Sequence, residues 1–406
     1  MRITSKMSWW CVVALVGLAM FAVACGSGSR AAPTTPTPGA TATVLPLLGP
    51  VVDEAFRWGY HPGQISGGHD PPQDYVALPP GYRIETYATG LQHPTVLAFA
   101  QDGRLLVAEQ AGAVRVIDNG VLRSEPFFQA DVYLPDATES IVELGLVGMT
   151  VGPDASVYIY YTADEPRRTV LARLQDDGEV GSGLEEIFSL DAAPSCCHVS
   201  GSMRFAPDGT LFVSVGDHQM ESEAQDKGSP FGAILRINPD GSAPEDNPFA
   251  GDDEADPRIY AYGLRNPYDF AIHPVNRRIF ASENGFLGQD AVVEVFPGAN
   301  YGWPGYDLDV PFAEVTWPLL FYHQPIGPAG MELYLDDELP VLTGALLFCQ
   351  FHQGGALHAV TFNLDGSVAN DSIVALGCTS DVTTGPDGFV YFLDYVGGTV
   401  YRIAAD

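Results

Sequence analysis

The sequence predicts an all-β fold, a six-bladed β-propeller, and three observations support this prediction. Turns of the Pro-Asp-Gly kind recur along the chain, each turn is followed by a pair of short β-rich runs, and almost no long helical pattern separates the pairs. The pairs recur at a spacing of roughly 50 to 60 residues, which is typical of four-stranded sheets repeated around an axis. A β-sandwich or a solenoid is the alternative architecture.

Six predicted hairpins follow one another along the chain. The first three pair runs 105–109 with 114–117, 157–161 with 170–174, and 211–215 with 234–237. The last three pair runs 279–282 with 292–296, 345–349 with 357–361, and 390–393 with 400–403. A further strand over 82–87 precedes the first hairpin. We expect it to pair with the last blade, because closing the ring removes exposed sheet edges.

Residues 1–24 have the pattern of a lipoprotein signal peptide. Arg2 and Lys6 precede an apolar run that ends at Ala24, and Cys25 follows a row of small residues. We expect Cys25 to become the acylated N-terminus of an exported protein, anchored by lipid to the outer face of a bacterial membrane in the cell envelope. A plain signal peptide or a single uncleaved anchor is the alternative, and both also place the remaining chain outside the cytoplasm.

The rest of the chain divides into a linker and one large domain. Between Gly26 and Pro50 the composition is dominated by Ala, Pro, Thr, Gly and Ser, which cannot bury a core. We therefore expect residues 25–74 to form a flexible, lipid-anchored linker and N-terminal extension. The propeller domain is expected over residues 75–406.

The charge of the chain excludes one class of partner. Without Arg2 and Lys6, 17 basic residues face 51 acidic ones, and this balance disfavours nucleic acid. An acidic surface suits calcium or a salty exterior, although solubility alone also explains it. Lys227 is the only lysine left after processing, so Schiff-base chemistry has a single weak candidate.

Four cysteines remain in the folded part, and an even number in an exported chain favours disulfides. Cys349 and Cys378 are expected to bridge the fifth and sixth repeat units. The neighbouring Cys196 and Cys197 leave three alternatives open: a vicinal disulfide, two reduced thiols, or a soft-metal site together with His198. A vicinal disulfide would close a strained and comparatively reducible ring.

The candidate reactive residues lie in loops of the third and fourth units. His198 follows the cysteine pair in a Ser/Gly-rich connection, where a neutral imidazole can accept a proton from a hydroxyl group. Arg265 lies in Tyr-Gly-Leu-Arg-Asn-Pro, close to long insertions over 216–232 and 242–258. The alternatives are a loop histidine satisfied by hydrogen bonds and an arginine that caps a turn.

Several motifs, in order, make a family resemblance specific. They are Leu91-Gln-His-Pro-Thr, Glu143-Leu-Gly-Leu-Val-Gly, His198-Val-Ser-Gly-Ser-Met-Arg-Phe-Ala-Pro-Asp-Gly, Ala-Ile-Leu-Arg-Ile-Asn-Pro-Asp-Gly-Ser, Tyr-Gly-Leu-Arg265-Asn266-Pro and Asn300-Tyr-Gly-Trp-Pro. From about Leu78 to Asp406 the chain resembles the soluble glucose/sorbosone dehydrogenases. These are six-bladed propellers that use pyrroloquinoline quinone (PQQ) and calcium.

The resemblance implies roles for residues at the matched positions. His198 resembles the base that removes the proton from the anomeric hydroxyl of an aldose, and Arg265 the cation beside the quinone oxygen. Glu143 and Asn266 match contacts to substrate or cofactor. Calcium would be held near Asp290 by the backbone carbonyls of Gly285 and Phe286, since it prefers oxygen ligands. Because no side chain accepts hydride, the cofactor would be the oxidant. Electrons would then pass to an external acceptor.

The chain also departs from the family pattern. Gln353 stands where the family has a lysine, Cys378 and Ser380 stand where it has Arg-x-Arg, and His323 stands at its aromatic stacking position. Asp290 is followed by alanine where the family has an Asp-Glu pair. We expect the side chains of His198, Arg265, Gln353, Cys378 and Ser380 to converge at one mouth of the propeller. The lost cations would weaken binding of the tricarboxylate PQQ.

Three functions fit these observations. The first is a PQQ-type sugar dehydrogenase that oxidises an aldose at its anomeric carbon to a lactone. The second is a non-catalytic surface propeller that binds glycan or protein after losing the cations for PQQ. The third is a calcium-dependent lactone hydrolase, because a fold alone does not determine function.

Overall fold

The computed structural model describes residues 78–135, 143–191, 196–286, 289–304, 315–322 and 324–406. The chain divides into two compact units, residues 1–43 and residues 44–406, and all described residues belong to the second unit. The predicted signal peptide, Cys25 and the whole predicted linker lie outside the described residues. Within the described part, no helix is long and apolar enough to cross a membrane.

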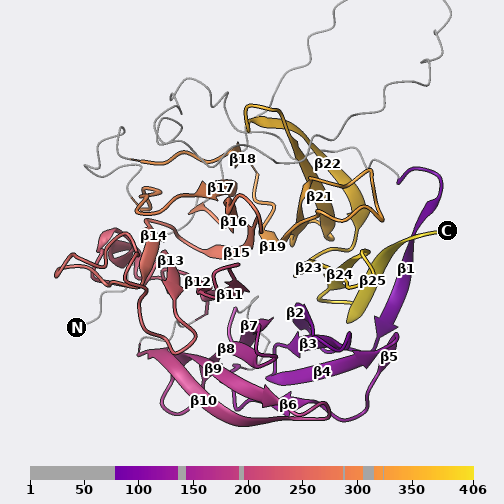
Figure 1. Ribbon diagram of the computed structural model, residues 1–406, viewed down its shortest axis with the longest axis horizontal. Helices are drawn as coiled ribbons and strands as arrows, with labels where there is room; N and C mark the ends of the chain where they lie inside the picture. Colours follow the sequence, from indigo (N-terminus) through magenta and orange to yellow (C-terminus); the bar gives the residue numbers. More distant parts are fainter. Residues whose placement is uncertain (1–77, 136–142, 192–195, 287–288, 305–314, 323) are drawn as a thin grey trace, which may run out of the picture. The chain divides into compact units, whose positions relative to one another are not determined.

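Six antiparallel sheets form the six blades of a β-propeller (Figure 1). The first blade consists of β2 (Pro94–Phe99), β3 (Leu105–Glu109), β4 (Ala113–Asp118), β5 (Val121–Leu122) and β6 (Phe128–Gln129). The second consists of β7 (Leu146–Val151), β8 (Val157–Ala163), β9 (Arg168–Asp176) and β10 (Gly181–Leu190). The third consists of β11 (Ser200–Phe205), β12 (Leu211–Val215), β13 (Ala233–Ile237) and β14 (Ile259–Tyr262). A short 3-10 helix, η2 (Glu221–Gln225), lies between β12 and β13.

The remaining blades complete the ring. The fourth consists of β15 (Pro267–Ile272), β16 (Ile279–Glu283), β17 (Ala291–Val295) and β18 (Leu320–Phe321). The fifth consists of β19 (Pro328–Leu333), β20 (Leu346–Gln350), β21 (Ala356–Phe362) and β22 (Val368–Leu376). The sixth consists of β23 (Val382–Thr384), β24 (Val390–Asp394), β25 (Thr399–Ala405) and β1 (Tyr82–Thr89). β1 pairs with β25, with Ile84 opposite Ile403. The predicted closure of the ring by the strand over 82–87 is confirmed.

The predicted hairpins are the second and third strands of the blades. Predicted runs 105–109 and 211–215 coincide with β3 and β12, whereas β17 and β20 are shifted by one residue from the predicted runs. The residues of β3, β12, β13, β16 and β20 are all buried. Both faces of these strands are covered by the neighbouring blades, so they read as continuous apolar runs.

The first strands of the blades form the inner ring. β2 contacts β7, and contacts continue through β11, β15, β19 and β23 back to β2. His198 lies shortly before β11, Asn266 immediately before β15, and Ser380 shortly before β23. Because each inner strand occupies the same place in its blade, the segments before these strands meet at one end of the ring. This end carries the candidate site.

Candidate active site

His198 forms a short hydrogen bond with a buried carboxylate. Its Nδ1 lies 2.6 Å from Oδ1 of Asp217, whose side chain is fully buried. The other oxygen, Oδ2, accepts a hydrogen bond of 2.8 Å from the indole Nε1 of Trp303. With the Nδ1 proton donated to Asp217, the lone pair of His198 Nε2 is available to take a proton.

The pKa of Asp217 lies below its usual range. Burial pushes this pKa upward, but hydrogen bonding and charge attraction from His198 outweigh burial, with further hydrogen bonds from the Gln219 backbone N–H and from Trp303. The carboxyl group is therefore ionised at neutral pH. It holds His198 in one tautomer and stabilises the positive charge that forms when Nε2 takes a proton.

Asp217 was not identified from the sequence. It follows β12 in a turn that begins at Gly216, where a Cβ atom would overlap the carbonyl of His198. The turn is fixed on two sides. The Asp217 N–H donates to the Arg265 carbonyl (2.8 Å), and the His218 N–H donates to the His198 carbonyl (3.2 Å). The available signal was an acidic residue two positions after the apolar run of β12, at the end of the ring that carries His198.

Glu143 connects the loops of three blades. Its Oε2 accepts hydrogen bonds from the backbone N–H of His198 (2.8 Å) and from Nδ2 of Asn266 (3.0 Å). Oδ1 of Asn266 accepts a further bond from the Ser200 hydroxyl (2.9 Å). The structure thus brings the predicted residues Glu143, His198 and Asn266 together. Their expected contacts to substrate or cofactor stay predictions.

Arg265 carries a positive charge that no described carboxylate neutralises through an ion pair. Its Nη1 donates to the carbonyls of Asn284 (2.8 Å) and Gly285 (3.2 Å), and its guanidinium carbon lies 5.6 Å from the centre of the Trp303 ring. Its Nε is buried and has no hydrogen-bond partner among the described residues. The backbone N–H of Arg265 donates to Glu283 Oε1 at 2.6 Å. Because burial raises the pKa of Glu283 to about 8, that carboxyl group is mostly neutral at pH 7.

Three predicted positions do not join this cluster. Gln353 is exposed, and its backbone is left-handed, with φ 60°. Ser380 is buried and donates its hydroxyl proton to the Pro94 carbonyl (2.9 Å). Cys378 is fully buried and disulfide-bonded to Cys349.

The expected convergence of all five side chains at the mouth is therefore wrong for Cys378, because its sulfur is bonded inside the apolar core of the last two blades. The predicted Cys349–Cys378 bridge is itself present. Cys196 and Cys197 form the vicinal disulfide, one of the three alternatives. His323 lies outside the described residues.

The predicted calcium loop is held by hydrogen bonds to the Asp290 carboxylate. Oδ1 of Asp290 accepts from the Gly285 N–H (3.1 Å), and Oδ2 accepts from the N–H groups of Ile326 and Gly327 (2.8 Å each). Burial raises the pKa of Asp290 above its usual value. The described residues contain no group of three or more His, Cys, Asp or Glu side chains placed to hold a metal. A cation here would rest on backbone carbonyls, and calcium stays a prediction.

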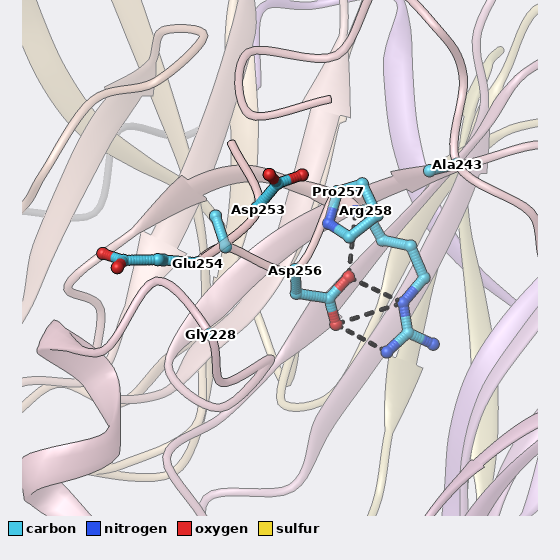
Figure 2. A pocket seen from close by; sticks show the side chains of 8 residues that line it. Gly228, Ala243, Asp253, Glu254, Asp256, Pro257 and Arg258 are labelled. Atoms are coloured by element: carbon cyan, nitrogen blue, oxygen red, sulfur yellow. Dashed lines mark hydrogen bonds and ion pairs between the residues drawn. The ribbon is translucent and has the colours of Figure 1, made fainter. Parts of the chain in front are cut away.

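Two hollows differ in their chemistry. One is lined by Arg265, Glu283, Gly285, Phe286 and Trp303, among others, and adjoins the cluster described above. The other lies in the insertion between β13 and β14 (Figure 2), where Asp256 and Arg258 form an ion pair of 2.6 Å. Figure 2 shows the side chains of Asp253 and Glu254 pointing away from this pair. The second hollow contains none of the candidate residues.

Comparison with known proteins identifies the family of the chain. The model of the Glucose / Sorbosone dehydrogenase family matches residues 91–402. The chain belongs to this family. It is 30% identical to the uncharacterized protein slr1608 of Synechocystis sp. over 348 residues, 77% of this chain and 84% of the relative. It is 26% identical to aldose sugar dehydrogenase YliI of Escherichia coli over 360 residues, 81% of this chain and 94% of the relative.

A solved structure shows the same fold. The PQQ-bound form of aldose sugar dehydrogenase from Streptomyces coelicolor matches with a TM-score of 0.67 and 23% identity, covering 81% of this chain and 100% of that chain. As a member of the glucose/sorbosone dehydrogenase family, this chain has the architecture of a sugar oxidoreductase. Relatives bind PQQ, which raises the question of whether the residues present here can hold it.

The residues fit the reactive end of PQQ better than its carboxylate end. The partly buried guanidinium of Arg265, whose Nε has no hydrogen-bond partner among the described residues, suits a developing negative charge on an oxygen. Three carboxylates require further cations, yet every other described arginine or lysine except Arg167 forms an ion pair with a carboxylate of this chain. Arg167 packs on the Tyr133 ring. Among the described residues, the fit to PQQ therefore rests mainly on Arg265, and few cations are left for the three carboxylates.

Proposed function

We propose that this chain is an exported sugar dehydrogenase that oxidises the anomeric hydroxyl of an aldose to a lactone, with PQQ as cofactor. The observation that supports it most directly is the pairing of His198 with buried Asp217, 2.6 Å apart, in a loop hydrogen-bonded to that of Arg265. This arrangement provides a base and a cation at one mouth of the propeller. A sugar substrate follows from the family.

The chain's residues divide the work between them. Nε2 of His198 takes the hydroxyl proton while the C1 hydrogen leaves as hydride, so the carbon loses two electrons and becomes a carbonyl. Asp217 stabilises the imidazolium that results. Arg265 supplies positive charge next to a neutral Glu283, and so its field is not cancelled. PQQ, when bound, supplies the hydride-accepting carbonyl that side chains lack. The electrons then pass to an external acceptor.

The test combines cofactor titration with turnover. The full-length protein, purified in detergent with calcium, is titrated with PQQ and assayed for dye reduction with a panel of aldoses. We expect dye reduction that requires both PQQ and sugar and that is lost in His198→Asn. Absence of PQQ binding at micromolar concentrations would rule out this function.

A second candidate function is a non-catalytic propeller that binds glycan or protein. The exposed amide of Gln353, the buried Ser380 and the bridged Cys378 favour it, because the family resemblance implies cofactor-binding cations at these three positions. The same titration separates the two candidates. Binding of an aldose or glycan without PQQ binding and without dye reduction would support the second.

Export and lipid anchoring are part of the first proposal. They rest on the apolar N-terminal run and on Cys25. We expect radiolabelled palmitate to be incorporated into the wild-type protein and not into Cys25→Ser. A labelled Cys25→Ser variant, or an unlabelled wild type, would contradict lipid attachment at this residue.

A further inference from the structure

The disulfide between neighbouring residues Cys196 and Cys197 lies directly before His198. Both cysteines are half-buried, whereas Cys349 and Cys378 are fully buried in the core. A bridge between neighbours closes a small ring around the connecting peptide, so it restricts the backbone that leads into the next residue. Accessible disulfides of this kind exchange with thiols more readily than buried structural ones.

The vicinal disulfide lies between the two segments that hold the base. The Cys196 carbonyl accepts a hydrogen bond of 2.8 Å from the N–H of Glu143, whose carboxylate accepts the N–H of His198. On the other side, Sγ of Cys196 lies 3.6 Å from Oε1 of Gln219, two residues after Asp217. The bridge therefore contacts both the Glu143 segment and the Asp217 turn.

The backbone around this bridge is unusually strained. Nine non-glycine residues of the described chain have positive φ, and four of them lie here: His198 (61°), Ser200 (55°), His218 (49°) and Gln219 (66°). Left-handed conformations cost free energy for residues with a Cβ atom, and they persist only where the surroundings enforce them. Hydrogen bonds enforce the turn after Asp217, while the covalent ring constrains the approach to His198.

We propose that the Cys196–Cys197 disulfide is a positioning device that holds His198 on Asp217, and that its reduction lowers the activity of the site reversibly. The cysteines do not contact the reacting atoms. Two molecules of a thiol reductant each give up a hydrogen to a cysteine sulfur, the Cys196–Cys197 bond breaks, and the two reductant sulfurs join in a new disulfide. The protein gains two electrons and two protons, and an oxidised disulfide reagent reverses the step.

Reduction opens the ring, so His198 is free to leave its left-handed conformation and its hydrogen bond to Asp217. We expect kcat to fall about tenfold or more, on the scale of the strain that is released, while KM changes little. Activity depends on the proposed dehydrogenase function, whereas the position of the imidazole does not. The test therefore includes a readout without turnover.

The experiment uses the full-length protein, oxidised and after treatment with a water-soluble phosphine. Alkylation and mass spectrometry should find two new thiols in the peptide containing Cys196 and Cys197, and none at Cys349 or Cys378. Proton NMR should show a low-field signal from the His198 Nδ1–H that His198→Gln lacks. This signal should weaken on reduction and return on reoxidation, and kcat should follow it.

A double variant, Cys196→Ser with Cys197→Ser, completes the test. Its His198 signal and its kcat should match those of the reduced wild type, and the reductant should change neither. Thermal melting checks that the variant folds. If the variant fails to fold, the reduced wild type still decides. An unchanged His198 signal in fully reduced protein overturns the proposal. A signal that responds to reduction in a protein without dehydrogenase activity supports the positioning role and refutes the proposed function instead.

Discussion

Asp217→Asn should remove most of the activity because an amide cannot replace this carboxylate in either orientation. The two oxygens of Asp217 accept hydrogen bonds from three donors: Oδ1 from His198 Nδ1 and the Gln219 N–H, and Oδ2 from Trp303 Nε1. An asparagine offers one oxygen and one NH2 group. If the NH2 group faces Trp303, it meets the indole N–H, and both groups are donors. If the NH2 group faces His198, Nδ1 must become the acceptor and the imidazole proton moves to Nε2. Nε2 then cannot act as a base.

The size of the effect follows from the bonds lost. A hydrogen bond to a charged group contributes about 1.5–3 kcal/mol, and a buried unsatisfied donor costs about 1–3 kcal/mol. Together with the unfavourable tautomer, these terms predict that kcat falls roughly 10²- to 10⁴-fold. The assay is PQQ-dependent dye reduction under saturating aldose, measured across pH.

The matched control is Asp371→Asn. Asp371 also accepts a hydrogen bond from a buried histidine, with its Oδ1 2.9 Å from Nδ1 of His358, but this pair lies within the fifth blade. We expect Asp371→Asn to lower the melting temperature while leaving kcat within about twofold, because neither residue belongs to the mouth cluster. Wild-type kcat in Asp217→Asn, or equal losses in both variants, would refute the catalytic reasoning.

Three further predictions concern the cofactor, pH and the Asp217 turn. Gln353→Lys returns a cation to an exposed position and should tighten PQQ binding by roughly 3- to 10-fold in calorimetric titration; unchanged or weaker binding would argue against a cofactor contact there. Burial raises the pKa of Glu283 to about 8, and burial together with repulsion from Asp269 raises the pKa of Asp381. The folded state therefore holds protons that the unfolded chain loses above about pH 4. The unfolding free energy should therefore decrease as pH rises from about 4 to 8, and calorimetry that finds greater stability at pH 8 than at pH 5 would contradict this. Gly216→Ala places a Cβ atom against the His198 carbonyl and should lower both the melting temperature and kcat, whereas Gly251→Ala, in open space, should change neither.

Much of the fold was predictable because the middle strands of each blade are buried on both faces. β3 and β12 combine a preceding turn with five consecutive buried residues, so their bounds were predicted to the residue. Outer strands carry a weaker signal. The ten residues of β10 include a long exposed stretch, and its sequence lacks the apolar run that marks an interior strand.

The site was predictable only in part, because loops bring its members together from distant parts of the sequence. His198 and Arg265 stand out through their motifs, but the turn that places Asp217 against His198 depends on contacts with both loops. Cys378 and Ser380 were expected at the mouth, yet a matched position does not say whether a side chain reaches solvent. Here one is covalently bonded in the core and the other hydrogen-bonds a neighbouring strand.

The pairing of β1 with β25 makes completion of the ring depend on two segments far apart in the sequence. Thr89 and its neighbours find their hydrogen-bonding partners only when Thr399–Ala405, more than 300 residues later in the chain, is in place. Until β1 and β25 pair, both strands present unpaired edges, which are open to proteases and to pairing with other chains. A chain that lacks β25 would therefore be more open to proteolysis and to pairing with other chains than the closed propeller.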